Sequence, residues 1–142
     1  MNRYLLDTNV ISESRKQAPD RHFQKWFDAQ TEDSLYLNVL TLGEIRKGIA
    51  HNPVPRHRKE MEEWLEDNLL PLFAGRILPV NRQVAEVWGE LSGRALREGR
   101  PRPVVDTLLA ATALVHGLTL VTRNTRDLAG TGVRTVNPWL GG

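Results

Sequence analysis

The sequence contains no cysteine, so disulfide bonds and thiolate metal sites are excluded. A reducing compartment fits this composition. Apolar runs are short, and the first one, Tyr4-Leu5-Leu6, is far too short for a membrane span or for the hydrophobic segment of a secretory signal peptide. We therefore expect a soluble, cytoplasmic protein with no membrane partner.

Several catalytic motifs are absent as well. The sequence has no P-loop, no G-x-G-x-x-G and no G-x-S-x-G. Its histidines are scattered, without an H-E-x-x-H motif or the ligand spacing of a zinc site, at His22, His51, His57 and His116. These absences argue against a P-loop nucleotidase, a dinucleotide-dependent enzyme, a serine hydrolase of the α/β type and a zinc protease.

The length of 142 residues predicts one globular domain, residues 1–142, that buries roughly two-thirds of its unfolded surface. Hydrophobic residues at 40% and charged residues at 25% are ordinary for such a domain. The net charge of +2 is compatible with a polyanionic partner and does not require one. No internal repeat or low-complexity segment interrupts the chain.

Short apolar runs alternate with helical patterns along the whole chain. The runs predict strands at 4–6, 35–37, 77–80, 118–121 and 133–136. Helices are expected at 10–14, 19–29, 41–51, 56–70, 84–96 and 104–115. This alternation predicts an α/β fold, a three-layer α/β/α sandwich whose central parallel sheet has about five strands, with the first strand at its centre.

Local signals set the expected helix ends. Thr41-Leu42-Gly43-Glu44 has the pattern of a capping box. Pro19 and Pro103 are suited to the first turn of a helix. The segment 94–102 holds four arginines, a glycine and a proline, and is expected to be a basic loop. The helix at 104–115 is apolar almost all round and should therefore be buried.

Acidic and amide side chains follow the predicted strands. Asp7 ends the first strand, Glu44 is expected in the first turn of the helix after the second, and Asp106 in the first turn of the buried helix. Asn124 and Asp127 follow the fourth strand. Because ligands of open parallel sheets gather at the carboxyl ends of the strands, we expect these residues to share one edge.

Each acid also has a purely structural interpretation. Asp7 is suited to cap the next helix, Glu44 to complete the capping box, and Asp106 and Asp127 to favour a helix dipole. Together they favour a site, because carboxylates ~4 Å apart repel by roughly 4 kcal/mol at an effective dielectric of about 20. A divalent cation removes that repulsion, and an oxygen-only set without His or Cys suits Mg²⁺ or Mn²⁺.

Basic residues lie within a few positions of these acids. A ring of cations around an acidic centre is expected for a site that holds a phosphodiester backbone. The alternative is a set of unrelated solvated faces. The residues are Arg15, Lys16, Arg46, Lys47, Arg100, Arg102, Arg123 and Arg126.

Four motifs in series resemble those of the PIN-domain ribonucleases, most closely the VapC-type and FitB-type toxins of bacterial toxin–antitoxin pairs. They are Asp7-Thr8-Asn9, the segment 42–48, Asp106 with Ala110-Ala111, and the segment 121–128 followed by Gly132-Val133. The resemblance covers essentially the whole chain. It implies an endoribonuclease that acts on single-stranded or looped RNA and leaves a 5′-phosphate and a 3′-hydroxyl.

The same resemblance implies roles for individual residues. Asp7, Glu44 and Asp106 are the principal site acids, and Asp7 and Asp106 the surest Mg²⁺ or Mn²⁺ ligands. Supporting polar positions are Thr8, Asn9 and Thr122. The arginines and lysine expected on the RNA backbone are Arg46, Lys47, Arg102, Arg123 and Arg126. A small antitoxin that blocks the site and a homodimer are also implied, with DNA bound only through the antitoxin.

One departure from the family pattern concerns the metal. The family often carries a further Asp two residues beyond the threonine that Thr122 matches, and here Asn124 stands in that place. Asn124 can ligate a metal or hold a water but adds no charge, and Asp127 is expected to act through water. A single resting metal is therefore the preferred interpretation. Leu128 stands where many members have phenylalanine.

Three other functions are compatible with parts of the pattern. A haloacid-dehalogenase-type phosphatase also begins with an aspartate after the first strand, but it needs a second aspartate where Asn9 stands. A receiver-like signalling module needs paired acids and a lysine that are not in place. A catalytically inactive RNA-binding module of the same fold is the third, which Asn124 favours and the retained acids oppose.

Overall fold

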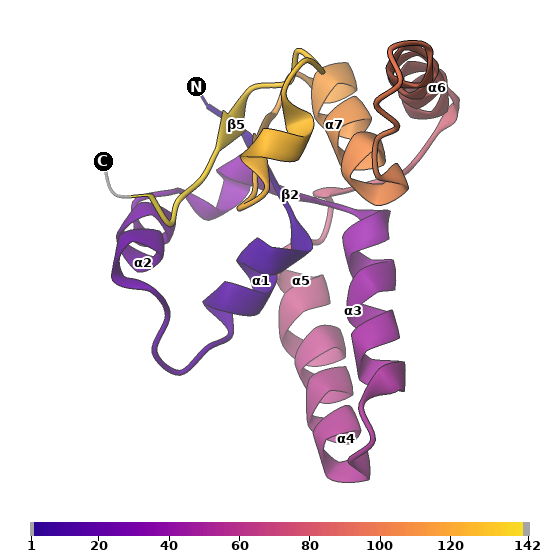
Figure 1. Cartoon of the computed structure of the whole chain (residues 1–142). Coiled ribbons are helices and arrows are strands. Elements are labelled where there is room, and N and C mark those ends of the chain that lie inside the picture. The colour runs from indigo at the N-terminus through magenta and orange to yellow at the C-terminus, as the bar shows by residue number, and fades with distance from the viewer. Residues whose placement is uncertain (1, 141–142) are drawn as a thin grey trace.

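A five-stranded parallel sheet forms the centre of the molecule (Figure 1). The structure, a computed structural model, describes residues 2–140. The strand order is β3-β2-β1-β4-β5, so the first strand is central, as predicted. The strands are β1 (Tyr4–Leu6), β2 (Leu35–Asn38), β3 (Ile77–Leu78), β4 (Thr119–Val121) and β5 (Thr135–Val136).

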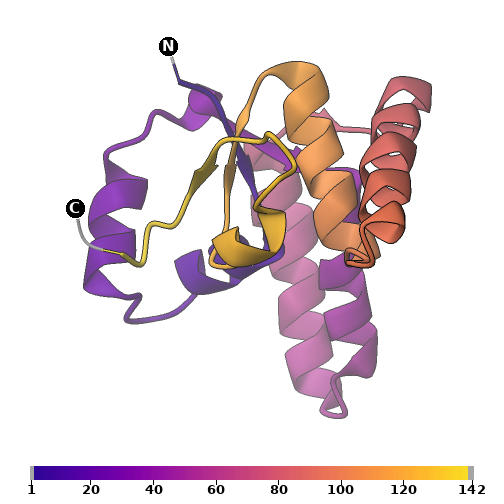
Figure 2. The same cartoon turned by 45° about the horizontal axis from the view of Figure 1, so that its top comes forward.

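Helices connect the strands and cover both faces of the sheet (Figures 1 and 2). The α-helices are α1 (Thr8–Ser14), α2 (Arg21–Asp28), α3 (Val39–His51), α4 (Pro55–Trp64), α5 (Leu70–Leu72), α6 (Arg82–Arg97) and α7 (Val104–His116). Two short 3-10 helices, η1 (Glu32–Ser34) and η3 (Thr125–Leu128), complete the connections. A π-helical stretch, η2 (Leu65–Leu69), joins α4 to α5.

The alternation of side chains along β1 separates two cores. Leu5 packs with Leu109 and Ala110 of α7 on one face of the sheet. Tyr4 and Leu6 pack on the other face, in the core that includes residues of α1, α2 and α3. Because successive strand residues point to opposite faces, three apolar residues in a row require cover on both sides. The α/β/α layering is therefore confirmed.

Helix α7 is buried, as its composition predicts. It is covered on one side by the sheet and on the other by α6, where Ala111 packs with Val84 and Leu91. The glycine after it, Gly117, has φ +67° and ends the helix in the left-handed conformation.

A hairpin of α3 and α4 extends away from the sheet and gives the molecule its elongated outline (Figures 1 and 2). Its base is part of the core that contains Ile45 and Ile49 of α3. Within residues 2–140, no helix is both long and apolar enough to cross a membrane.

The predicted capping box at Thr41 is wrong. Asn38 caps α3 instead, and its side-chain oxygen accepts a hydrogen bond from the backbone N–H of Leu40 over 2.7 Å. The helix therefore follows β2 directly and begins at Val39. Thr41 lies inside the helix with its hydroxyl buried, and Glu44 lies in the second turn rather than the first.

Other element ends also differ from the prediction. Helix α2 begins at Arg21 rather than at Pro19, because Asp20 caps it by accepting a hydrogen bond from the N–H of Phe23 over 3.0 Å. Helix α6 continues to Arg97, so the expected basic loop at 94–102 begins in its last helical turn. Pro103 precedes α7 as its N-terminal cap residue. The helix expected at 56–70 continues to Leu72, and β3, β4 and β5 are each shorter than predicted.

Candidate acidic site at the carboxyl edge of the sheet

Asp7 lies directly after β1 and is fixed by two hydrogen bonds. Its Oδ1 accepts from the backbone N–H of Thr8 over 2.6 Å, which caps α1. Its Oδ2 accepts from the hydroxyl of Thr122, at the end of β4, over 2.7 Å. The structural interpretation of Asp7 as a helix cap is thus correct, and each carboxylate oxygen keeps a lone pair for another ligand.

The environment of Asp7 opposes its ionisation. Burial raises the pKa of this carboxyl, the hydrogen bonds from Thr122 and Thr8 lower it, and the charge of Glu44 raises it again, with a net upward shift. A buried carboxylate with an unfavourable charge nearby is stabilised by a bound cation.

Asp106 lies in the first turn of α7 and is partly exposed. Burial raises the pKa of its carboxyl, and the charges of Asp7, Asp127 and Glu44 raise it further. Three acids from three other segments therefore act electrostatically on Asp106. The sequence predicts this gathering, although these residues are up to 120 positions apart in the chain.

Glu44 reaches this edge from α3. The hydroxyl of Thr8 donates to Glu44 Oε1 over 2.6 Å, which joins α1 to α3 beside Asp7. Thr8 thus contacts one acid through its backbone and another through its side chain. Two of the three supporting polar residues suggested by the sequence, Thr8 and Thr122, are hydrogen-bonded to site acids.

Asn124 lies just beyond Thr122, and its backbone N–H donates to the threonine hydroxyl oxygen over 3.1 Å. It precedes η3 and is exposed. Asp127 is exposed on η3. Both side chains are therefore accessible beside the other acids.

The oxygen donors at this edge suit a hydrated divalent cation. Among residues 2–140, no three His, Asp or Glu side chains are grouped closely enough to surround one ion by themselves. Mg²⁺ usually binds through one or two carboxylates and keeps several waters, so such a cage is not needed. Two residues after Asp7, Asn9 Oδ1 is buried and finds no hydrogen-bond partner in the described part of the chain. The residues present therefore fit Mg²⁺ or Mn²⁺ with part of its water shell retained.

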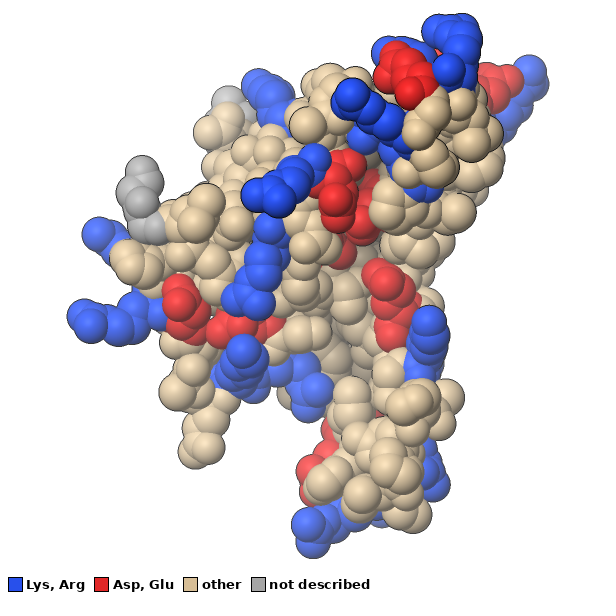
Figure 3. Space-filling view, in the orientation of Figure 1, with Lys and Arg blue, Asp and Glu red and all other residues tan. Residues whose placement is uncertain are grey.

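Lys and Arg side chains flank acidic ones on the face shown in Figure 3. Arg46 pairs with Glu66, and Lys47 is exposed. Arg123 stacks over the ring of Trp139, 4.2 Å from its centroid. Arg46 and Arg123 are thus partly engaged by the protein, whereas Lys47 is exposed to solvent.

Arg102 is the most firmly held of the five predicted RNA-backbone residues. It donates to the backbone carbonyls of Asp127 over 3.1 Å and of Ala129 over 2.9 Å. Arg126 lines the same hollow as Arg102. Arg102 therefore fixes the segment that carries Asp127, in addition to any contact with a substrate.

The sequence reasoning missed Arg94 as a residue of this region. Arg94 lies on α6 and lines one cavity with Arg100, Arg102 and Arg126. The signal that locates it is helical spacing, because Leu91 and Ala95, the buried residues around it, continue the apolar face of the helix expected at 84–96 through the position of Arg94.

Residues 4–132 match the PIN domain. The chain therefore belongs to the PIN-domain family. Within this family it is similar to the VapC-type and FitB-type toxins.

Two relatives and one solved structure show this similarity. The VapC ribonuclease Y4jK of Sinorhizobium fredii is 38% identical over 135 residues, which cover 95% of this chain and 96% of the relative. Toxin FitB of Neisseria gonorrhoeae is also 38% identical, over 95% of this chain and 97% of its own. The structure of FitAB bound to the IR36 DNA fragment matches with a TM-score of 0.90 and 35% identity, over 98% of this chain and 97% of that chain. The phosphatase and receiver alternatives lose their support.

Proposed function

We propose that this chain is a metal-dependent endoribonuclease and the toxin of a toxin–antitoxin pair. The observation that carries the proposal is the gathering of acids at the carboxyl edge of the sheet, where Thr8 and Thr122 fix Asp7 and Thr8 also binds Glu44. The raised pKa values of Asp7 and Asp106 agree with it. A ribonuclease among the relatives supports the same activity.

Asp7 and Asp106 would hold Mg²⁺ or Mn²⁺, with Glu44 direct or through water and Asp127 through water. Such an ion, when bound, activates water for in-line attack on phosphorus and neutralises charge on the phosphoryl oxygens. The fixed position of Asp7 between Thr8 and Thr122 supplies a preorganised oxygen pair, because its carboxylate cannot rotate without breaking a hydrogen bond.

The polar neighbours keep this arrangement in place. Thr122 orients Asp7, and Thr8 orients Glu44. Asn9 and Asn124 would offer uncharged oxygens to a hydrated Mg²⁺ or Mn²⁺ held there. The arginines and Lys47 at the rim position the RNA backbone and carry little sequence information.

The partners follow from the same relatives. Toxin FitB is a relative, and FitAB was solved on a DNA fragment. We propose that a small antitoxin covers the acidic site of this chain, that any DNA contact is made through that antitoxin, and that the toxin forms a homodimer. We propose a cytoplasmic location, because cellular RNA is the proposed substrate.

The test is cleavage of total RNA by protein purified free of any partner. Reactions contain Mg²⁺, Mn²⁺ or EDTA, and compare the wild type with Asp7→Asn and Asp106→Asn. A matched control is Glu86→Gln, because Glu86 is an exposed acid that pairs with Arg82 on α6. Discrete metal-dependent fragments that both aspartate variants lose, and the control keeps, support the proposal.

The second candidate is an inactive RNA-binding module, which the uncharged Asn124 favours. Well-folded wild-type protein that binds RNA but yields no fragments with either metal supports this candidate. Fragments that persist in both aspartate variants would instead show a contaminating nuclease and contradict the site.

A further inference from the structure

A cavity of about 490 Å³ lies between the C-terminal end of α6, the segment 98–103 and η3. Its volume falls within the range of roughly 300 to 1,000 Å³ that is usual for ligand sites. Four arginines line it, Arg94, Arg100, Arg102 and Arg126. We call it the arginine cavity.

The charges of the arginine cavity are not balanced internally. Glu98 and Asp127 are the acids that line it, against four guanidinium groups. The ion pairs found among residues 2–140 do not include any of these four arginines. Arg94, Arg100 and Arg126 are exposed, whereas Arg102 is half-buried and held by backbone carbonyls. The cavity therefore has an excess of positive charge with one rigid cation in its wall.

Helix α7 adds to this positive potential. Pro103 lines the cavity and precedes α7, a helix of 13 residues to which no side chain of the described residues supplies an N-cap. The amino end of a helix carries a partial positive charge and free N–H groups, which favour anions. The uncapped helix end and the arginines therefore act in the same direction.

The arginine cavity adjoins the acidic site. Asp106 lies three residues after Pro103, within the same first turn of α7. Asp127 lines the cavity, and its charge also raises the pKa of Asp106. A chain that passes over Asp106 therefore meets the cavity within about one helical turn, roughly 5.4 Å along the axis.

We propose that the arginine cavity binds a phosphate of the RNA strand that flanks the cleaved bond. This inference rests on the proposed ribonuclease function. Guanidinium groups bind phosphate oxygens in bidentate pairs, which suits a cavity lined by several arginines. The cavity holds the strand beside the acids, so that RNA long enough to reach both is the preferred substrate.

The decisive variant is Arg94→Gln combined with Arg100→Gln. Arg102 is not used, because its removal also breaks two hydrogen bonds to the segment 127–129. Arg97→Gln is the matched control: Arg97 is exposed in the same last turn of α6 but does not line the cavity. Thermal unfolding checks that each variant is folded, and the single variant Arg100→Gln serves if the double variant is not.

Binding of a single-stranded RNA oligonucleotide is measured by fluorescence anisotropy in EDTA, over a series of salt concentrations. We expect the double variant to bind about tenfold more weakly and its salt slope to fall by roughly 0.7 for each RNA phosphate that it no longer neutralises. Arg97→Gln should retain nearly wild-type binding. In cleavage assays the double variant should raise KM and leave kcat nearly unchanged.

The outcomes separate this inference from the proposed function. RNA binding that depends on Arg94 and Arg100, in a protein that cleaves nothing, would contradict the nuclease proposal and keep the cavity as an RNA-phosphate site. RNA cleavage by the double variant with unchanged RNA affinity, salt slope and KM would overturn the proposed phosphate site and leave the proposed ribonuclease function in place. Unchanged RNA binding, together with loss of inhibition of RNA cleavage by the proposed antitoxin, would overturn the phosphate site. The arginine cavity would then bind an acidic segment of that protein.

Discussion

The hydroxyl of Thr122 donates to Asp7 Oδ2 over 2.7 Å, and so joins two residues that are 115 positions apart in the chain. Both are buried, at the carboxyl ends of the adjacent strands β4 and β1. The bond lowers the pKa of Asp7 against the larger effect of burial. The pairing of β4 with β1 therefore helps to set the pKa of Asp7 in the site.

Replacing Thr122 with valine removes this bond while it nearly conserves volume. We expect a loss of about 1 to 3 kcal/mol in the free energy of unfolding, because Asp7 Oδ2 and the N–H of Asn124 both lose a partner. The pKa of Asp7 should rise further. Urea denaturation measures the stability, and Thr122→Ser, which keeps the hydroxyl, is the control. Equal stability of Thr122→Val and wild type would contradict the coupling.

Asp106→Asn should stabilise the metal-free protein at neutral pH. The pKa of Asp106 is raised by burial and by the charges of Asp7, Asp127 and Glu44, so the folded state holds the proton more tightly than the unfolded state. The resulting penalty is absent below the ordinary aspartate pKa of about 3.9 and is complete above the raised value. The variant should therefore have the higher Tm in EDTA at pH 7, and the difference should vanish at acidic pH.

The control for this prediction is Asp28→Asn, because Asp28 is an exposed acid on α2. Added Mg²⁺ should raise the Tm of the wild type and change that of Asp106→Asn much less. A metal-free variant that melts below the wild type at pH 7 would show that Asp106 is satisfied by the protein alone.

Asn124→Asp should tighten metal binding. A carboxylate in place of the exposed amide adds a negative charge beside Thr122 and Asp7, and the backbone bond to Thr122 is unaffected. We expect roughly tenfold tighter binding of Mn²⁺, equal to about 1.4 kcal/mol, measured by isothermal titration calorimetry. The isosteric wild-type amide is itself the uncharged control, and Asn68→Asp adds a charge on the exposed surface of η2. If both variants bind alike, Asn124 lies outside the metal site.

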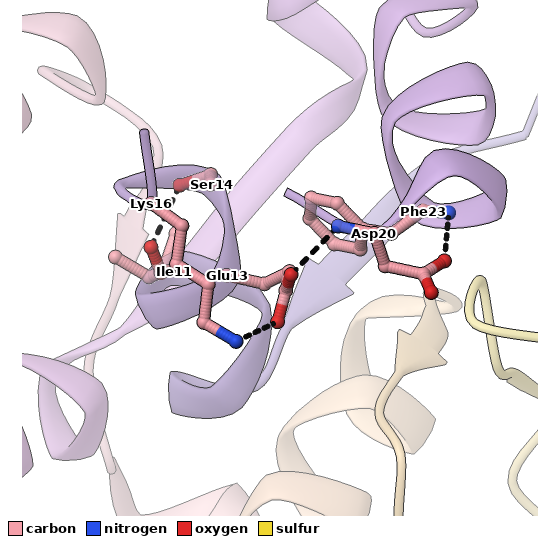
Figure 4. Close-up of polar contacts among 6 residues, drawn as sticks. All are labelled: Ile11, Glu13, Ser14, Lys16, Asp20 and Phe23. Carbon is pink, nitrogen blue, oxygen red and sulfur yellow. Dashed lines mark hydrogen bonds and ion pairs between the residues drawn. The ribbon is translucent and has the colours of Figure 1, made fainter. Parts of the chain in front are cut away.

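Glu13 is a buried carboxylate outside the acidic site, and Figure 4 shows its surroundings. It forms an ion pair with Lys16 at 2.8 Å and accepts a hydrogen bond from the N–H of Asp20 over 2.9 Å. The contact with Lys16 lowers the pKa of Glu13 most, and the hydrogen bond from Asp20 lowers it next. Glu13 thereby links the end of α1 to Asp20, the residue that caps α2.

Glu13→Gln should cost about 1 kcal/mol at neutral pH, because the amide keeps an acceptor for Asp20 but loses the charge. The lowered pKa means that the carboxylate stabilises the fold above the ordinary glutamate pKa of about 4.3, and this contribution is lost as pH falls through the lowered value. Urea denaturation from pH 7 to pH 3 should show the two proteins converging in acid. A constant difference over that range would contradict an ionic role.

The extent to which sequence predicts this molecule depends on how local each signal is. The predictions of a strand at Tyr4–Leu6 and of a buried helix α7 are confirmed, because three apolar residues in a row and a helix that is apolar almost all round leave little choice of environment. Thr41 shows the limit. Its T-x-x-E pattern fits a helix start, but Asn38 already caps the helix three residues earlier, at the end of β2.

The hydrogen bonds within the site are harder to predict from the sequence than the elements that carry them. Hydrogen bonds from Thr8 to Glu44 and from Thr122 to Asp7 depend on the order of the strands and on side-chain rotamers that no local pattern encodes. Arg94 falls where the helix expected at 84–96 and the basic loop expected at 94–102 overlap, because Gly99 and Pro101 follow it closely. The helix nevertheless continues past it, because Ala95 is buried against the core.

The central position of β1 has a consequence for synthesis. The ribosome adds Asp7 well before its neighbours Asp106 and Thr122, which follow it by 99 and 115 positions. Contacts of such long sequence separation form late, because the intervening chain must first be closed into a loop. A nascent chain therefore carries its acids apart, and the site is assembled only after β4 has emerged and paired with β1.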